Sequence, residues 1–492
     1  MPSNLAELPS EIYSAILTQV PPDERQQAVL SLSRAIPQSP VPLHHLFECI
    51  RLKTSEGVFR LYRRVRGSPE EAGWVKSFAL ETWTVDADIV VNLASVLTRL
   101  RRITLFVGPN FAPEHLEEIL KKPREDLLCL SLRFRPYVQK ATYYQFLKGA
   151  YFDTTLQALA RWPSYSLPTL SIVQDPLDPE IARAQRFAQP LVFFHLDVLS
   201  KLVCSPCFRS ASNFRLRIPS RQVAPFLFNT PRTATALTLL DLSTCHVRSV
   251  DVEGLLARFS HLKHLILDGC TIAQGQSHEG DWAAVGKMVA LGTVKAAKDR
   301  EKKLKTWLEG NAARLQTSEG GISQQPVGEQ RPGRRIRPGR RGLATATISL
   351  RDSPPREAVH VVHHNISVPK IRVLPAAPTI CSLSTTLNAH NRDIHTIRTE
   401  FQQGWGEGIA QLNAIHRRLY QSWKNGVRVM CISDDQDMED GFEGLEDIES
   451  ETLFHDVLCT APVLCLADSN ETNEHAEGCG HAAAIRIWDD AI

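Results

Sequence analysis

Two segments near the middle of the chain share one order of hydrophobic and polar positions. Residues 237–247 and 262–272 both have the form L-x-x-L-x-L-x-x-C-x-V/I, and their first leucines are 25 residues apart. Between them, residues 251–262 carry apolar side chains at i, i+3, i+4 and i+7, the spacing of one helix face. The pattern therefore predicts a unit made of a short buried strand, a turn and an amphipathic helix.

The same frame recurs upstream, so that seven copies span residues 75–272. The five earlier frames begin at Val75, Leu100, Leu127, Leu167 and Ala211. A strand–helix unit that recurs after about 25 residues is typical of leucine-rich repeats, whose leucines fill one continuous core. We therefore predict an α/β fold with an irregular leucine-rich-repeat solenoid over residues 71–280. The alternative is that these helices and strands belong to an ordinary α/β domain.

The positions between the leucines of each frame predict a binding surface. In a strand, alternate side chains point to opposite faces, so these residues face away from the leucine core. Curved repeat arrays bind partners through that concave face. The predicted substrate-binding residues are Arg102, Thr104, Phe106, Ser131, Arg133, Asp241, Ser243, His264 and Asp268.

The N-terminal residues predict two amphipathic helices. Leu8, Ile12, Ile16 and Val20 are four residues apart and share one helix face. Pro9 stands at a helix start, where its missing N–H costs nothing. The segment 21–23 breaks the chain, and a second helix follows it.

This segment resembles an F-box, whose opening motif matches Leu8, Pro9, Glu11, Ile12, Ile16, Leu17 and Val20. An F-box followed by repeats is similar to the F-box/leucine-rich-repeat substrate receptors of SCF-type cullin-RING ubiquitin ligases. The later part of the motif keeps Arg34 but has no tryptophan.

The resemblance implies that residues 1–70 form a helical module that docks a Skp-type adaptor and, through it, the cullin complex. The adaptor-binding residues it implies are Leu8, Pro9, Ile12, Ile16, Leu17 and Val20. The concave face would then hold a protein substrate, and the chain itself would be no enzyme. The alternatives are a helical cap over the first repeat and a non-catalytic scaffold with no role in ubiquitin transfer.

The remaining chain divides by composition. Residues 281–309 predict one long helix, and residues 310–342 predict a disordered linker with six arginines at 331–341. Residues 343–492 predict a C-terminal α/β extension or cap with a helix near 394–423 and an acidic loop at 434–451. Within that helix, the glycines at 404, 406 and 408 predict a kink or a close packing contact.

Composition limits the function classes. The 56 Lys and Arg residues nearly balance the 54 Asp and Glu residues, which argues against a dedicated nucleic-acid binder. No signal peptide and no run of about 20 apolar residues is present, so we expect no membrane span. We expect a cytoplasmic or nuclear protein, or one found in both compartments.

Catalytic motifs are not found, and we expect no cofactor. The segment His475–Cys479–Gly480–His481, with Cys465 and His455 nearby, has two alternative interpretations. Imidazole and thiolate groups at this spacing could close a tetrahedral zinc site. The other interpretation, on which we predict no metal, is a polar glycine-containing segment with incidental histidines.

Overall fold

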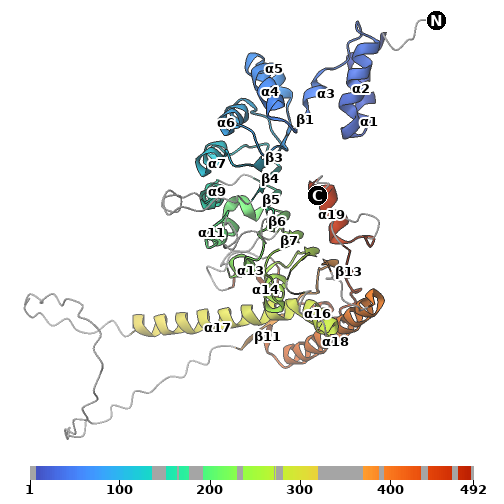
Figure 1. The fold of residues 1–492 in the computed structure, drawn as a ribbon. Helices are drawn as coiled ribbons and strands as arrows, with labels where there is room; N and C mark the ends of the chain where they lie inside the picture. The colour runs from blue at the N-terminus through green and yellow to red at the C-terminus, as the bar shows by residue number, and fades with distance from the viewer. Residues whose placement is uncertain are drawn as a thin grey trace, which may run out of the picture.

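A ten-stranded parallel β-sheet organises the protein (Figure 1). The computed structural model describes residues 7–135, 151–162, 166–176, 192–229, 236–270, 272, 281–319, 370–386, 393–433, 442–467 and 475–488. The strands are β1 Cys49–Leu52, β2 Ser77–Leu80, β3 Arg102–Val107, β4 Cys129–Phe134, β5 Thr169–Gln174, β6 Asn213–Arg217, β7 Leu239–Asp241, β8 His264–Ile266, β10 Ser382–Ser384 and β13 Val463–Cys465. They lie side by side in this order.

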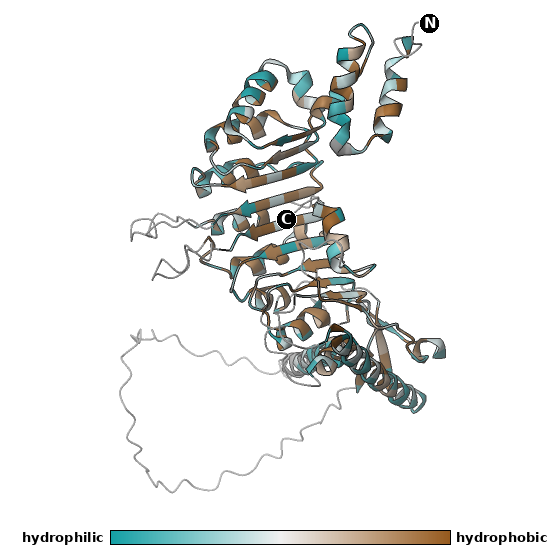
Figure 2. Cartoon of the chain, turned by 45° about the vertical axis from the view of Figure 1, so that its right-hand side comes forward, coloured by the Kyte–Doolittle hydropathy of each residue, from teal (hydrophilic) through white to brown (hydrophobic). Residues whose placement is uncertain are grey.

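Helices connect the strands and cover one face of the sheet (Figure 1). These helices are α4 Ser55–Gly67, α5 Pro69–Trp74, α6 Ala87–Val96, α7 Pro113–Leu120, α9 Asp153–Ala160, α11 Val198–Val203, α12 Pro206–Arg209, α13 Ala224–Phe228 and α14 Ser249–Arg258. Leucines of the repeated frames, such as Leu105, Leu132 and Leu240, are buried in the core beneath them. The opposite face, here called the inner face, carries the alternate and more polar strand positions, as the banding of Figure 2 illustrates.

The predicted fold class is wrong, although each of the seven frames does contain a strand. The structure is an α/β unit with one all-parallel sheet, not an irregular leucine-rich-repeat solenoid. Three of its strands lie outside the repeated frames, because β1 precedes them and β10 and β13 come from more than 100 residues beyond β8. The leucine spacing did not separate the two architectures, since any parallel strand with one helix-covered face buries the same alternate positions.

The N-terminal residues form a small helical module at the β1 end of the sheet (Figure 1). It comprises α1 Ser10–Gln19, α2 Pro22–Ala35 and α3 His44–Phe47, so both predicted helices are confirmed. Its core is a cluster of its own, made of Tyr13, Leu17, Val29 and Val41. The module therefore packs around its own apolar residues and meets the sheet through α3 and the adjoining β1.

Apart from β10 and β13, the described residues after β8 form helices and a second sheet. The predicted single helix is instead two helices, α16 Asp281–Ala290 and α17 Gly292–Glu319, while the predicted helix near 394–423 is confirmed as α18 Ile394–Lys424. Three further strands, β9 Ile371–Leu374, β11 Arg428–Ile432 and β12 Leu445–Asp447, form a separate sheet in the order β12-β11-β9. The short 3-10 helix η2 spans Glu451–Phe454, and the last helix, α19, spans Gly480–Trp488.

Some predicted segments fall outside the described residues. These are the arginine cluster at 331–341, most of the predicted linker, and residues 434–441 of the predicted acidic loop. Residues 310–319 of the predicted linker belong to α17, and the acidic segment's residues 445–447 form β12. Within the described residues, no helix combines the length and the apolar character needed to cross a bilayer.

Glycines allow α16 and α18 to approach backbone to backbone. A Cβ atom at Gly404 would lie 1.8 Å from the Ala283 carbonyl oxygen, and one at Gly408 would lie 2.6 Å from the Ala290 Cβ. On the facing helix, a Cβ at Gly286 would lie 2.1 Å from the Phe401 carbonyl oxygen. The predicted close packing contact is confirmed at residues 404 and 408, whereas Gly406 faces open space.

We predict that Gly404→Ala destabilises the protein and that Gly406→Ala does not. The added methyl group at residue 404 collides with backbone, and overpacking of this kind costs about 1–3 kcal/mol or more. At residue 406 the same change gains up to about 1 kcal/mol of helix propensity. Urea unfolding of both variants measures this difference, and equal stabilities would contradict the close crossing of the two helices.

Candidate functional site

A row of residues, each paired with a residue of the next strand, crosses the inner face of the sheet. Neighbouring strands place Thr104, Ser131, Ser171 and Arg215 side by side, and the row continues through Asp241, Ile266, Ser384 and Cys465. The charged part of the row is buried, since Arg215 is 2% exposed and Asp241 is fully enclosed. The row is therefore partly exposed at Thr104 on β3 and buried from Ser131 on β4 onward.

Asp241 is the counter-ion of two buried arginines. Its Oδ2 accepts hydrogen bonds from Arg215 Nε at 3.0 Å and from Arg217 Nη2 at 2.7 Å. The Ser243 hydroxyl donates to Oδ1 at 2.7 Å. Burial alone would raise the pKa of Asp241, but the charges of Arg217 and Arg215 hold it well below its usual range. A permanent carboxylate is therefore shared by two guanidinium groups inside the sheet and offsets one of their two positive charges.

The last helix, α19, covers this part of the inner face. Trp488 and Ala484 pack on Leu239 and Ile266 of β7 and β8. The Arg215 guanidinium lies 4.0 Å from the centre of the Trp488 ring, a cation–π contact. Figure 1 shows α19 on the side of the sheet opposite the connecting helices. The C-terminal residues thus close the inner face over β6 to β8.

This closure divides the predicted substrate-binding residues into two groups. Arg102, Thr104, Phe106 and Arg133 are half-buried on β3 and β4, and Ser131 lies between them almost fully buried. Asp241, Ser243 and Asp268 are buried beneath the C-terminal residues, and His264 lies close to Ser382 Oγ, with Nδ1 at 2.9 Å. Asp241, Ser243 and Asp268 therefore cannot contact a partner while α19 occupies this face.

Near β3 and β4 the inner face carries an aromatic and cationic cluster. The rings of Trp83 and Phe106 have centres 4.7 Å apart. The Arg133 guanidinium lies 5.3 Å from the Phe106 ring centre, and that of Arg135 lies 5.8 Å from the Trp83 ring centre. We call these four residues the aromatic–arginine cluster. Tryptophan and arginine are enriched among the residues that dominate protein–protein binding energies.

The predicted adaptor-binding residues differ in their exposure to solvent. On α1, Ile12 and Ile16 are 44% and 48% exposed, and Pro9 is also exposed. Leu8 and Val20 are half-buried. Leu17 is 1% exposed and belongs to the core of the module, so it stabilises α1 and does not offer a contact surface. Two further apolar residues of the module, Leu30 and Leu43, are exposed.

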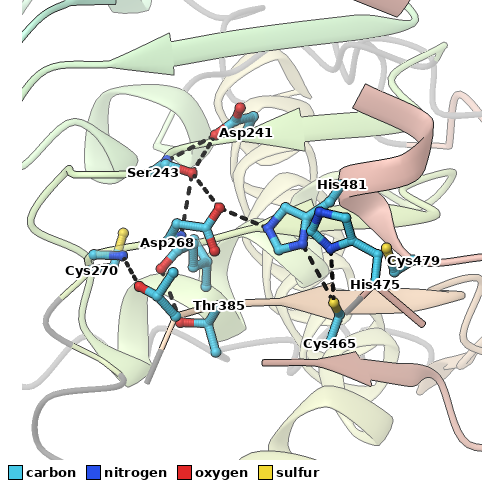
Figure 3. Close-up of polar contacts among 12 residues, drawn as sticks. Asp241, Ser243, Asp268, Cys270, Thr385, Cys465, His475, Cys479 and His481 are labelled. Atoms are coloured by element: carbon cyan, nitrogen blue, oxygen red, sulfur yellow. Dashed lines mark hydrogen bonds and ion pairs between the residues drawn. The ribbon is translucent and has the colours of Figure 1, made fainter. Parts of the chain in front are cut away.

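Two cysteines and two histidines converge where β13 meets the start of α19 (Figure 3). One ligand atom from each of Cys465, His475, Cys479 and His481 lies within 4.8 Å of the others. Cys465 Sγ is 3.4 Å from His481 Nδ1 and 3.7 Å from His475 Nδ1. We call these four residues the Cys–His cluster. His455, the other candidate named by the sequence, is exposed and does not belong to it.

Asp268 connects the Cys–His cluster to the buried arginine network. Its Oδ2 is 2.8 Å from His481 Nε2, and the Ser243 hydroxyl lies between Asp268 and Asp241 (Figure 3). Burial alone would lower the pKa of His481, but hydrogen bonds to Asp268 and Cys465 raise it to about 9. The hydrogen bond from Cys479 lowers the pKa of Cys465. The cluster therefore favours a cysteine thiolate beside an imidazolium when no metal is bound.

Sequence reasoning missed the roles of Asp268, Arg215, Arg217 and Trp488. Asp268 was predicted to lie on the substrate-binding surface, because the repeat frame shows only to which face of the strand a side chain points and not what covers that face. For the two arginines the sequence does contain a signal, because charged residues alternate with buried apolar residues in Asn213–Arg217. A cation at such a position needs a partner charge, and Asp241 stands at the matching position of the next frame.

A hollow of about 370 Å³ lies at the amino ends of β2 to β5. Its lining residues are Lys76, Ser77, Arg101, Arg102, Leu128, Cys129, Pro168 and Thr169. The lining includes no carboxylate and no histidine, the groups that most often carry general acid–base chemistry. We therefore place no reaction in this hollow.

We predict that Asp241→Asn destabilises the protein by about 3–5 kcal/mol, because it removes the charged carboxylate that two buried guanidinium groups share. The matched control is Asp175→Asn, whose partner Arg133 is one-third exposed, and we expect it to cost about 1 kcal/mol or less. Urea unfolding at pH 7 measures both changes.

The effect of Asp241→Asn also has a defined pH dependence. Because the pKa of Asp241 is depressed in the folded protein, its contribution is complete above the unfolded-state value of about 3.9 and is lost as the pH falls below it. The stability gap between the two proteins should therefore persist from pH 7 to pH 5. A gap of less than about 1 kcal/mol at pH 7 would contradict the assigned role of Asp241.

No protein-family model matches the chain, and no curated protein matches it at a significant level. We therefore infer a function from the residues and contacts described above.

Proposed function

We propose that the protein is a non-catalytic substrate receptor that docks on a Skp-type adaptor of an SCF ubiquitin ligase. The observation that carries this proposal is the exposed apolar face of α1, where Ile12 and Ile16 lie one helical turn apart. The F-box-like motif supplies the identity of the proposed partner. Recognition would be of the helix-in-groove type, with isoleucine anchors entering an apolar groove.

The internal packing of the module supports a docking role. Tyr13 and Leu17 already provide α1 with a buried face, so Ile12 and Ile16 are not needed for the module's own core. A helical cap would instead turn its apolar residues toward the first strand that it shields. The module meets the sheet through Phe47 of α3, which packs in the main core, and through Gln26, which donates a hydrogen bond to the Cys49 carbonyl oxygen. The isoleucines remain available for a partner.

The substrate would bind the inner face over β2 to β5. The aromatic–arginine cluster offers this region large rigid rings and cationic groups, while α19 closes the rest of the face. A bound protein would be held near the ligase's other subunits, and ubiquitin transfer would follow from proximity. No residue of this chain would then take part in forming or breaking a covalent bond. From this proposed role we also propose a cytoplasmic or nuclear location for the protein.

We predict that the double change Ile12→Asp and Ile16→Asp abolishes adaptor binding by the full chain. Each burial of such a side chain contributes about 1.5–3 kcal/mol, so charging both should weaken binding by at least about a hundredfold. The measurement is a titration of purified adaptor with the full-length wild type and variant.

The matched control is Leu453→Asp with Leu458→Asp, which charges two exposed apolar residues outside the module. This control should bind the adaptor like the wild type. A well-folded wild type that does not bind the adaptor would overturn the proposal and leave a scaffold role. Equal loss in the control would show that the effect is not specific to α1.

A further inference from the structure

We propose that Cys465, His475, Cys479 and His481 form a structural zinc site that fastens the C-terminal residues to the sheet. The four ligands come from β13, from the segment before α19 and from the start of α19. Two thiolates and two imidazoles are a ligand set that selects tetrahedral Zn²⁺. The proposal does not depend on the adaptor-docking function.

The separations in the Cys–His cluster match a tetrahedral centre. With Zn–S near 2.3 Å and Zn–N near 2.0–2.1 Å, a tetrahedral angle places sulfur and nitrogen about 3.6 Å apart. The distances from Cys465 Sγ to His481 Nδ1 and His475 Nδ1 are 3.4 and 3.7 Å. These two sulfur–nitrogen separations fit a tetrahedral ion, and all four ligand atoms lie within 4.8 Å of one another.

Asp268 supplies an independent observation in favour of a metal site. In metal sites, a ligating histidine usually donates its second ring N–H to a carboxylate, which fixes the ring orientation. His481 has this arrangement, because Nε2 faces Asp268 Oδ2 at 2.8 Å while Nδ1 faces the cysteine sulfur (Figure 3). A carboxylate–histidine pair of this geometry directs the Nδ1 lone pair into the cluster.

The backbone also holds the ligands against the sheet. A Cβ at Gly480 would lie 3.0 Å from Ile266 Cγ1 and 3.1 Å from Ser384 Oγ. The absence of a side chain at residue 480 thus lets α19 begin close to β8 and β10. The residues on either side, Cys479 and His481, are then brought to Cys465 on the neighbouring strand.

Burial indicates a structural role for the ion. Cys465, Cys479 and His481 are each 2% exposed or less, and His475 is half-buried. Four protein ligands leave no open coordination position for water or substrate, which separates structural from catalytic zinc sites. The ion would stabilise the closed arrangement in which α19 covers the buried arginine network.

The test is the metal content and spectrum of the purified full chain. We expect about one zinc per chain by mass spectrometry, and visible bands of tetrahedral thiolate-bound Co²⁺ when cobalt replaces zinc. Cys465→Ser and Cys479→Ser should each lose the bound zinc and change the cobalt spectrum. Cys459→Ser, a partly buried cysteine outside the cluster, is the matched control and should retain both.

Asp268→Asn keeps the shape of the side chain and tests the site even if the cysteine variants fail to fold. We expect its zinc affinity, measured by competition with a chromophoric chelator, to fall about 10- to 100-fold. An affinity equal to that of the wild type would contradict the role given to Asp268. A folded wild-type chain that takes up neither Zn²⁺ nor Co²⁺ in tetrahedral form, or that carries a Cys465–Cys479 disulfide after purification under reducing conditions, would overturn the site.

Discussion

The buried carboxylate of Asp241 is the interaction on which the inner face depends. Two guanidinium groups on β6 would be costly inside a sheet without it, because an unpaired charge is strongly disfavoured away from water. With this shared carboxylate in place, Arg215 presents its flat face to Trp488, and α19 packs on Leu239 and Ile266. This strand face thereby packs against a helix that starts more than 210 residues further along the chain.

The polar network continues from that carboxylate to the Cys–His cluster. Ser243 lies between Asp241 and Asp268, and Asp268 orients His481. These side-chain contacts join strands β6 to β8 to α19, the last described helix. The two halves of the inner face therefore differ, since the region over β6 to β8 is closed by α19 while the aromatic–arginine cluster near β3 and β4 is partly exposed. The apolar face of α1 lies at the same end of the sheet as that cluster.

Local structure was more predictable from the sequence than its assembly. All seven repeated frames contain strands. The glycines of α18 predicted a kink or a close packing contact, and the structure has the contact, with α16 as the partner helix. The fold class was wrong because the leucine pattern reports only one buried face of a strand. That β10 and β13 extend the same sheet depends on pairings such as Ser382 with His264, which no local pattern reveals. The two alternatives for His475, Cys479 and His481 could not be separated without Asp268, whose contact spans 213 residues.

Hydrogen exchange of the full-length chain, measured with and without an excess of zinc chelator, tests most directly whether the C-terminal residues are fastened to the inner face by a metal. We expect chelation to accelerate exchange in α19, β13 and β10 and to leave β2 to β5 unchanged, because only the first three depend on the Cys–His cluster. Identical exchange in α19 and β13 under both conditions would contradict a metal that fastens them.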